Sequence, residues 1–204
     1  MNKPILGFEH IYIDHGSNRT LLLLHGTGGD EKDLLPIGQA LDDQANILSP
    51  RGKVSENGAL RFFKRLAEGV LDRDDLKLRS AELGEFLVEC SKIYHFDLNE
   101  VWAVGFSNGA NIALNLLATN PKVLSKAILL RPTSLTALPD VVSNLSNSLA
   151  LVLSGVADTM VHLGDGQKIA QALSVAGAEV EFHELPAGHG LTGQDIKHAK
   201  DWLA

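Results

Sequence analysis

A serine flanked by glycines stands where a buried strand pattern passes into a helical pattern. Residues 101–104 read Val-Trp-Ala-Val, residues 105–109 read Gly-Phe-Ser-Asn-Gly, and an apolar helical pattern follows. A strand, a tight turn and a helix in this order are typical of a nucleophile elbow, in which the turn presents a serine hydroxyl at the head of a helix. The helix amides favour negative charge that develops beside them. The sequence therefore predicts that Ser107 is a nucleophile.

A nucleophilic serine needs a base that removes its proton and an acid that orients this base. When the serine stands in an elbow of this kind, the acid and then the histidine follow it along the chain. Asp158 comes shortly after the apolar run 149–154, and His189 lies between two glycines after the next strand pattern. We therefore expect Asp158 to be the acid and His189 to be the base.

Other residues compete for these two roles. His162 lies closer to Asp158 in the sequence, so it stays open as the base or as a residue that lines the mouth of the pocket. Asp140 and Asp165 are the rival acids. Asp158 and His189 each follow a predicted strand, at the end of the sheet where functional residues gather, and this favours them over these alternatives.

Attack of a serine on a carbonyl carbon also requires backbone N–H groups that stabilise the oxyanion. One is expected from Asn108, which follows the nucleophile, and the other from the loop after the early buried run 20–24. That loop reads His-Gly-Thr-Gly-Gly-Asp at 25–30. We expect the N–H of Thr27, with Gly28 as the alternative, and we expect His25 to brace the loop through hydrogen bonds.

The same glycine-rich loop does not match a nucleotide site. It lacks the Gly-Lys-Ser/Thr ending of a P-loop and the spacing of a dinucleotide fingerprint. The sequence also contains no His-Glu-x-x-His or comparable ligand motif, so neither a catalytic metal nor a cofactor is expected. A formal charge of −7, from 18 basic and 25 acidic residues, disfavours nucleic acid and anionic membrane surfaces as partners.

The elements that must position these residues alternate between strand and helix patterns. Seven strands are predicted, at 11–13, 20–24, 46–49, 101–105, 126–130, 149–154 and 179–185. Five helices are predicted, at 33–41, 74–94, 108–119, 164–176 and 194–203. This alternation indicates an α/β fold with a mainly parallel seven-stranded sheet and helices on both faces, with the functional residues beyond the carboxyl ends of the strands.

Two stretches, 50–73 and 132–148, do not fit this alternation and are expected to be long loops at the rim of the site. The first could act as a lid, a question that the sequence leaves open. Within it, Phe62 and Phe63 either line a substrate pocket or pack in the core, and Glu56 either contacts substrate or is a solvated charge.

Length and composition indicate one domain over residues 1–204, without room for a large cap domain. The hydrophobic fraction of 45% and the charged fraction of 21% are typical of globular proteins. Cys90 is the only cysteine, no run is long enough to span a membrane, and the N-terminal stretch is not typical of a signal peptide. The cytoplasm is therefore the expected compartment.

With these residues in place, the whole chain resembles the small bacterial carboxylesterase and phospholipase branch of the α/β-hydrolases, which is related to acyl-protein thioesterases. The resemblance is carried by His-Gly-Thr-Gly-Gly at 25–29, Pro-Arg-Gly at 50–52, Phe-Phe-Lys-Arg at 62–65, the elbow at Ser107, Ser-Gly-Val-Ala-Asp at 154–158, and Gly-His at 188–189. Within the branch it looks closest to hydrolases grouped with methylhydroquinone and quinone resistance, whose rim segment also has Glu-Asn-Gly followed by paired aromatics, here at 56–58 and 62–63.

This resemblance implies a cofactor-free serine carboxylesterase that acts on short-chain or small aromatic esters, and a homodimer, which is common in the branch. An acyl-protein thioesterase or a lysophospholipase is the nearer alternative. A catalytically silent ligand-binding protein is the alternative of another class, because a fold by itself does not establish activity.

Overall fold

The computed structural model describes residues 2–67, 69–133, 137–140 and 142–204. Its centre is a seven-stranded sheet with the order β1-β3-β2-β8-β9-β10-β11. β1 is antiparallel to β3, and every other neighbouring pair is parallel. The strands are β1 His10–Ile13, β2 Thr20–Leu24, β3 Asn46–Pro50, β8 Val101–Phe106, β9 Lys126–Leu130, β10 Leu149–Gly155 and β11 Glu179–Leu185. All seven predicted strands are confirmed.

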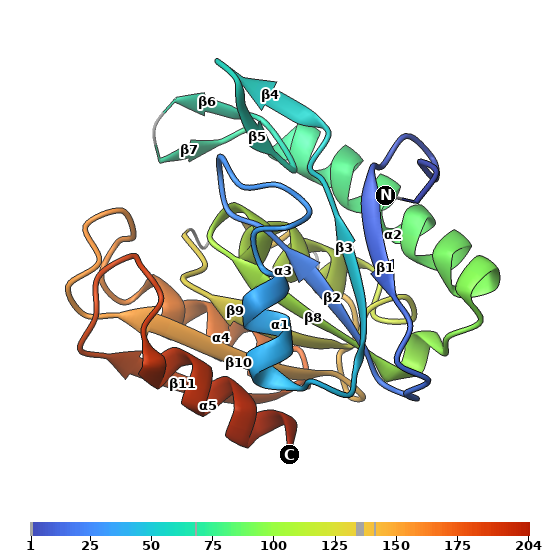
Figure 1. Cartoon of the computed structure of the whole chain (residues 1–204). Helices are drawn as coiled ribbons and strands as arrows, with labels where there is room; N and C mark the ends of the chain where they lie inside the picture. The colour runs from blue at the N-terminus through green and yellow to red at the C-terminus, as the bar shows by residue number, and fades with distance from the viewer. Residues whose placement is uncertain (1, 68, 134–136, 141) are drawn as a thin grey trace.

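Helices cover both faces of this sheet, as Figure 1 shows. The described residues form five α-helices, α1 Leu35–Leu41, α2 Arg73–Tyr94, α3 Asn108–Thr119, α4 Asp165–Val175 and α5 Gly193–Leu203, and a short 3-10 helix at Leu98–Glu100. Each predicted helix is confirmed to within about two residues, the usual spread of helix boundaries. α1 and α5 pack on one face, and α2, α3 and α4 pack on the other.

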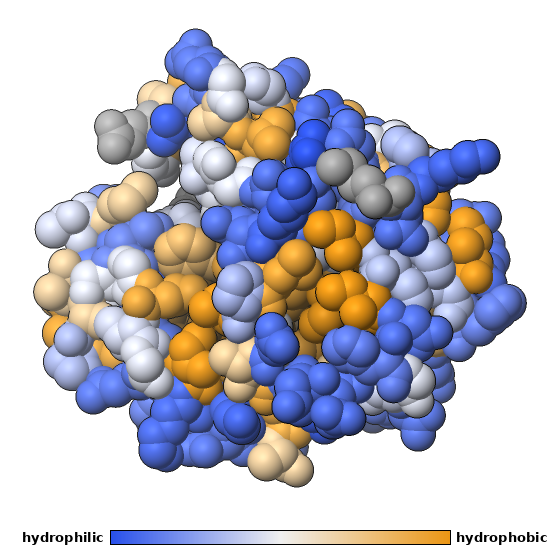
Figure 2. Space-filling model, in the orientation of Figure 1, coloured by the Kyte–Doolittle hydropathy of each residue, from blue (hydrophilic) through white to orange (hydrophobic). Residues whose placement is uncertain are grey.

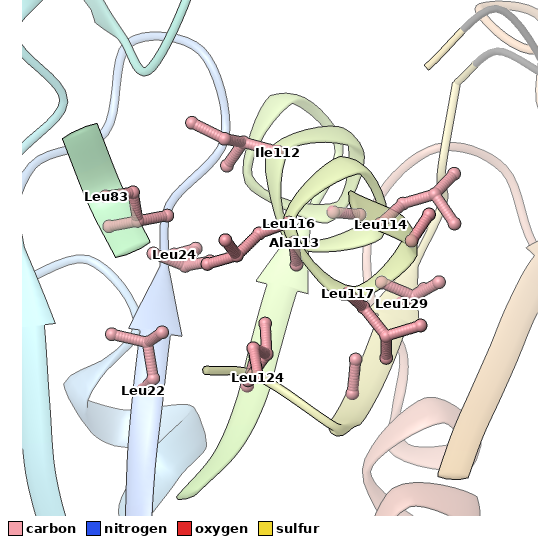
Figure 3. Close-up of a cluster of buried hydrophobic side chains, with 14 of the residues drawn as sticks. Leu22, Leu24, Leu83, Ile112, Ala113, Leu114, Leu116, Leu117, Leu124 and Leu129 are labelled. Atoms are coloured by element: carbon pink, nitrogen blue, oxygen red, sulfur yellow. The ribbon is translucent and has the colours of Figure 1, made fainter. Parts of the chain in front are cut away.

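The core lies in two layers because strand side chains alternate between the faces of a sheet. In β2, Leu22 and Leu24 join the layer beneath α2 and α3, whereas Leu21 and Leu23 join the layer beneath α1 and α5. Figure 3 shows Leu22 and Leu24 with side chains of α3 in the first layer. Burial on both faces explains the unbroken leucine run of this central strand.

The segment 50–73 is not the plain loop that the sequence suggested. It forms two hairpins, β4 Val54–Glu56 with β5 Ala59–Arg61, and β6 Arg65–Ala67 with β7 Val70–Leu71. The first turn has positive φ at Asn57 (52°) and Gly58 (88°), as a two-residue type I′ turn requires. Both hairpins lie at the top of Figure 1.

The described part of 132–148 forms no strand or α-helix, which agrees with the expected loop.

Polar side chains dominate the face of the molecule in Figure 2, with smaller apolar patches between them. Among the described residues, no helix is both long enough and apolar enough to cross a membrane.

Candidate active site

Ser107 occupies the turn between β8 and α3, and its backbone is strained. Its φ of 53° and ψ of −111° lie in a region that L-residues rarely adopt. The Ser107 N–H donates to Leu130 O on the neighbouring strand at 2.9 Å, and the Asn111 N–H donates to Ser107 O at 3.0 Å. The neighbouring strand β9 and the first turn of α3 therefore hold the serine in this conformation.

The two glycines of the elbow are required by close backbone contacts. A Cβ at Gly105 would lie 2.5 Å from Gly109 O, and a Cβ at Gly109 would collide with the carbonyl group of Leu24. Real Cβ atoms do not approach backbone this closely. The Gly-x-Ser-x-Gly pattern is therefore a packing requirement where β8, α3 and β2 meet.

Asp158 and His189 lie next to Ser107, although the three residues come from distant parts of the chain. His189 Nδ1 lies 2.8 Å from Asp158 Oδ2, and His189 Nε2 lies 3.0 Å from Ser107 Oγ. An imidazole that donates its Nδ1–H to the carboxylate keeps Nε2 as an acceptor for the serine hydroxyl. The Asp158 side chain is 2% exposed and that of His189 is 18% exposed. The arrangement is suited to nucleophilic acyl transfer.

The rival residues lie elsewhere. His162 is exposed and lines a small cavity that Asp158 also borders, but His189 makes the contact with the serine. Asp140 is highly exposed and pairs with Arg73 at 2.6 Å. Asp165 is the first residue of α4 and lies 3.7 Å from Lys168.

A buried ion pair holds the loop that carries His189. The Arg131 guanidinium donates to the two Asp195 carboxylate oxygens at 2.6 and 3.0 Å, and its Nε donates to Gly188 O at 2.9 Å. Both charged side chains are 0% exposed. Arg131 therefore links α5 directly to the residue before His189.

The Asp195 carboxylate also caps the start of α5. Its Oδ2 accepts hydrogen bonds from the backbone N–H and the hydroxyl of Thr192, both at 2.8 Å, in a capping box. The His189 loop is thus tied at Gly188 and at Thr192 to the same buried pair. No role was predicted for Arg131 or Asp195 from the sequence. The one local sign of such a role is that Arg131, a basic residue, directly follows the buried run 126–130.

The glycine-rich loop 25–30 follows β2 at the same end of the sheet. The Gly28 N–H donates to Leu60 O at 2.9 Å, so this amide is already engaged. Among the described residues, the N–H groups of Thr27 and Asn108 have no intramolecular acceptor. Of the two amides that the sequence left open in this loop, that of Gly28 is therefore engaged within the fold and that of Thr27 is not.

His25 braces this loop by hydrogen bonds, as the sequence suggested. Its Nδ1 lies 2.7 Å from Gly26 O, and its Nε2 accepts the Gly52 N–H at 3.0 Å. This pattern requires a neutral imidazole with the proton on Nδ1. Burial lowers the pKa of His25 below its usual value, against smaller opposing effects of the Gly26 carbonyl and of nearby carboxylates.

The Pro-Arg-Gly segment 50–52 also contacts this loop and the residue after it. Arg51 forms a bidentate pair with the fully buried carboxylate of Glu31. The hydrogen bond from Arg51 is the main cause of a lowered Glu31 pKa. A Cβ at Gly52 would collide with the backbone of Arg61, so a glycine is needed where this segment passes the first hairpin.

Phe62 and Phe63 are 2% and 0% exposed and belong to the core beneath α2 and α3. The Phe62 ring lies 4.7 Å from that of His25, and its N–H donates to Asn108 Oδ1 at 2.8 Å. This burial favours the packing interpretation over a pocket lining. The backbone amide of Phe62 thus links the segment 50–73 to Asn108, the residue that follows Ser107.

Glu56 contacts basic residues of its own segment rather than an open site. Its carboxylate pairs with Arg65 at 2.9 Å and with the buried Arg61 at 3.5 Å. Arg61 in turn donates to Thr27 Oγ1 at 2.9 Å and to Phe63 O at 3.1 Å. Arg61 at the end of the first hairpin and Phe62 directly after it therefore contact the side chains of Thr27 and Asn108.

Comparison with known proteins gives consistent matches, and the matching proteins cover nearly the whole chain. The family model described as Phospholipase/Carboxylesterase matches residues 66–204. The "Putative hydrolase MhqD" of Bacillus subtilis (strain 168) is 40% identical over 197 residues, which cover 95% of this chain and 96% of that protein. The structure of the Bacillus cereus carboxylesterase superimposes with a TM-score of 0.90 at 40% identity, covering 96% of this chain and 92% of the other. A carboxylesterase from Mesorhizobium loti gives 0.89 at 28% identity, covering 96% and 94%.

Proposed function

Because this chain belongs to the phospholipase/carboxylesterase family of α/β-hydrolases, we propose that it hydrolyses short-chain or small aromatic carboxylic esters through an acyl-enzyme on Ser107. The observation that carries this proposal is the continuous contact from Asp158 through His189 to Ser107, at 2.8 and 3.0 Å. The family is one of serine hydrolases, and the substrate class and the residue roles are the proposed part.

In the first half of the reaction, His189 Nε2 accepts the hydroxyl proton while Ser107 Oγ attacks the ester carbonyl carbon. Asp158 stabilises the imidazolium that forms and keeps the ring in the required tautomer. The oxyanion is held by the N–H groups of Thr27 and Asn108. His189 then donates its proton to the leaving alcohol, and Ser107 remains acylated.

In the second half, His189 deprotonates a water that attacks the acyl carbon of the ester on Ser107. The same two amides stabilise the second oxyanion. Its collapse releases the carboxylic acid, and the proton returns from His189 to Ser107 Oγ. No redox step is involved, and atoms and charge balance with one ester and one water as reactants.

Two sets of contacts act as positioning groups in this scheme. Arg61 and the Phe62 amide hold the side chains of Thr27 and Asn108, and therefore orient the two oxyanion amides. Arg131 holds Gly188 O and therefore fixes the loop of the base. Correct placement of such groups contributes strongly to rate, since small displacements of reacting groups cost about a hundredfold.

The test combines Ser107→Ala with a control, Ser174→Ala, at an exposed position of α4. Hydrolysis of a p-nitrophenyl acetate or butyrate should fall by at least about a thousandfold in Ser107→Ala, because the residual groups cannot replace the nucleophile. The control should keep wild-type kcat/KM, and both variants should keep the wild-type circular dichroism spectrum. A fluorophosphonate should label the wild type on Ser107, as located by peptide mass spectrometry.

Retention of wild-type turnover in Ser107→Ala, or labelling at another serine, would overturn the assignment. A panel of ester, thioester, lysophospholipid and lactone substrates, compared by kcat/KM, then tests the substrate class. Higher efficiency on long-chain thioesters or lysophospholipids than on short esters would contradict the proposed class while leaving the nucleophile intact. A folded wild-type protein that binds the esters without turnover would support the silent binding protein instead.

A further inference from the structure

Three side chains with metal-binding atoms lie together where α5 meets β11, and none of them is among the hydrogen-bond partners of Ser107 or His189. Glu181 and His183 are two residues apart on β11 and therefore point to the same face of the strand. His198 comes from α5, and its ring centroid lies 4.1 Å from that of His183. The sequence spacing matches no metal motif, and the fold brings the three together.

The distances between their ligand atoms are compatible with one bound ion. One nitrogen of each imidazole and one oxygen of Glu181 all lie within 4.8 Å of one another, and Glu181 Oε1 lies 2.5 Å from His183 Nε2. Bonds of about 2.0–2.2 Å to a tetrahedral ion place neighbouring ligand atoms roughly 3.3–3.6 Å apart. Side chains that are 49% exposed at Glu181 and 31% exposed at His183 can reach this spacing by small rotations.

The donor set indicates the class of ion. Two imidazoles and one carboxylate suit Zn²⁺ and related transition metals, whereas Mg²⁺ and Ca²⁺ prefer sets made of oxygen atoms. Lys197, the neighbouring cation on α5, is paired with Asp201, which reduces its repulsion of an ion. We propose that Glu181, His183 and His198 form a Zn²⁺ site, with water as the remaining ligand.

The place of this site in the fold suggests a structural effect. The connection 186–192 between β11 and α5 carries His189, and the proposed ion joins the two elements on either side of it. The ion would therefore hold the outer side of the same junction that Arg131 and Asp195 hold from within. It takes no part in ester hydrolysis, since none of its ligands contacts the Ser107 site.

The test is a calorimetric titration of the full chain with ZnCl₂ in metal-free buffer. One ion per chain should bind the wild type in the micromolar range and raise its melting temperature, because a ligand that binds the folded state stabilises it. His183→Asn, His198→Gln and Glu181→Gln should each weaken binding by at least about tenfold, because each removes one of three protein ligands. His95→Asn is the control: this histidine is exposed at the end of α2 with φ of 61°, which Asn tolerates.

His189→Ala separates this site from the triad, whose imidazole and carboxylate could also bind Zn²⁺. The proposal requires that His189→Ala and His95→Asn bind the ion as the wild type does. It also requires that His198→Gln hydrolyses esters at the wild-type rate without added zinc. Three results would overturn the proposal: zinc binding that survives in both His183→Asn and His198→Gln, zinc binding that disappears in His189→Ala, and zinc binding that appears only at millimolar concentration. The three side chains would then be a hydrogen-bonded surface cluster only. Circular dichroism of each variant shows that a loss of binding is not a loss of fold.

Discussion

The two sides of the candidate active site are held in place by different kinds of interaction. On the oxyanion side, the loop 25–30 is held by several separate hydrogen bonds, from Gly52 to His25, from Gly28 to Leu60 and from Arg61 to Thr27. The ion pair beside this loop, Arg51 with Glu31, has an arginine that is partly exposed. On the base side, the His189 loop depends on the ion pair of Arg131 with Asp195, whose two side chains are fully buried, together with the bond from the Ala157 N–H to Ala187 O. The loss of one hydrogen bond from a distributed set should lower the free energy of unfolding only a little. The removal of one partner of a buried ion pair should lower it much more, because a charge stays buried without its partner.

Arg131→Met is expected to have the largest effect on stability. It leaves Asp195 as a buried carboxylate without its cation, which should lower the free energy of unfolding by about 3–5 kcal/mol. The carbonyl of Gly188 also loses its donor, so kcat should fall. Urea unfolding and steady-state kinetics measure the two effects.

The double variant Arg131→Met with Asp195→Leu sharpens this result. Removal of both charges should recover part of the lost stability, because no unpaired charge remains buried. The activity should stay low, since Gly188 O still lacks its donor. Full recovery of kcat in the double variant would show that the pair stabilises the fold without positioning the base.

Arg61→Met tests the oxyanion side and should affect rate more than stability. Loss of the bonds to Thr27 Oγ1 and Phe63 O should lower the free energy of unfolding by about 1–2 kcal/mol. We expect kcat to fall by roughly ten- to a hundredfold with little change in KM, because the displaced amide acts on the transition state. The matched control is Arg65→Met, which removes another partner of Glu56 without touching Thr27. Equal losses of kcat in the two variants would argue against a positioning role for Arg61.

Acid should weaken the oxyanion side through His25, and this is the smallest expected effect. The pKa of folded His25 lies below its ordinary value, so below about pH 6.5 the unfolded chain takes up a proton that the folded chain does not. The free energy of unfolding should therefore fall as the pH drops from about 6.5 towards the folded pKa, by at most about 1.4 kcal/mol per pH unit for this one proton.

His25→Gln provides the comparison, because glutamine can donate and accept hydrogen bonds but does not titrate. The difference in slope between the wild type and this variant isolates His25 from His10, whose pKa burial also lowers. Urea unfolding at several pH values from 5 to 8 measures both slopes. Identical slopes would show that the pH dependence originates elsewhere.

The sequence was sufficient for the sheet and helices because burial leaves a strong local pattern. Central strands such as Thr20–Leu24 are apolar on both faces, and helices such as Asn108–Thr119 follow the elbow directly. The hairpins in 50–73 were missed because their strands have only two or three residues, too few for a period to show. The Asn57-Gly58 pair was the turn signal that could have revealed the first of them.

The three residues in contact at Ser107 could be proposed from the sequence because the strand order places Asp158 and His189 at strand ends. The residues that hold these three in place could not be predicted from the sequence. Arg131 and Asp195 are 64 positions apart, and the amide of Phe62 reaches Asn108 across 46 positions, without any local pattern that marks either pair. Such contacts depend on the three-dimensional arrangement of loops, which hydrophobic periodicity does not describe.

The contact between Arg131 and Asp195 has a consequence for the order in which a refolding chain becomes an enzyme. Ser107 and its elbow are complete once β2, β8, β9 and α3 have packed, since Leu130 supplies the contact across the strands and Gly109 packs against Leu24. The His189 loop receives its support only when α5 docks and brings Asp195 to Arg131. In a refolding experiment, the recovery of esterase activity should therefore follow the docking of α5 and lag behind the burial of the central sheet, so that turnover reports on the completion of the fold.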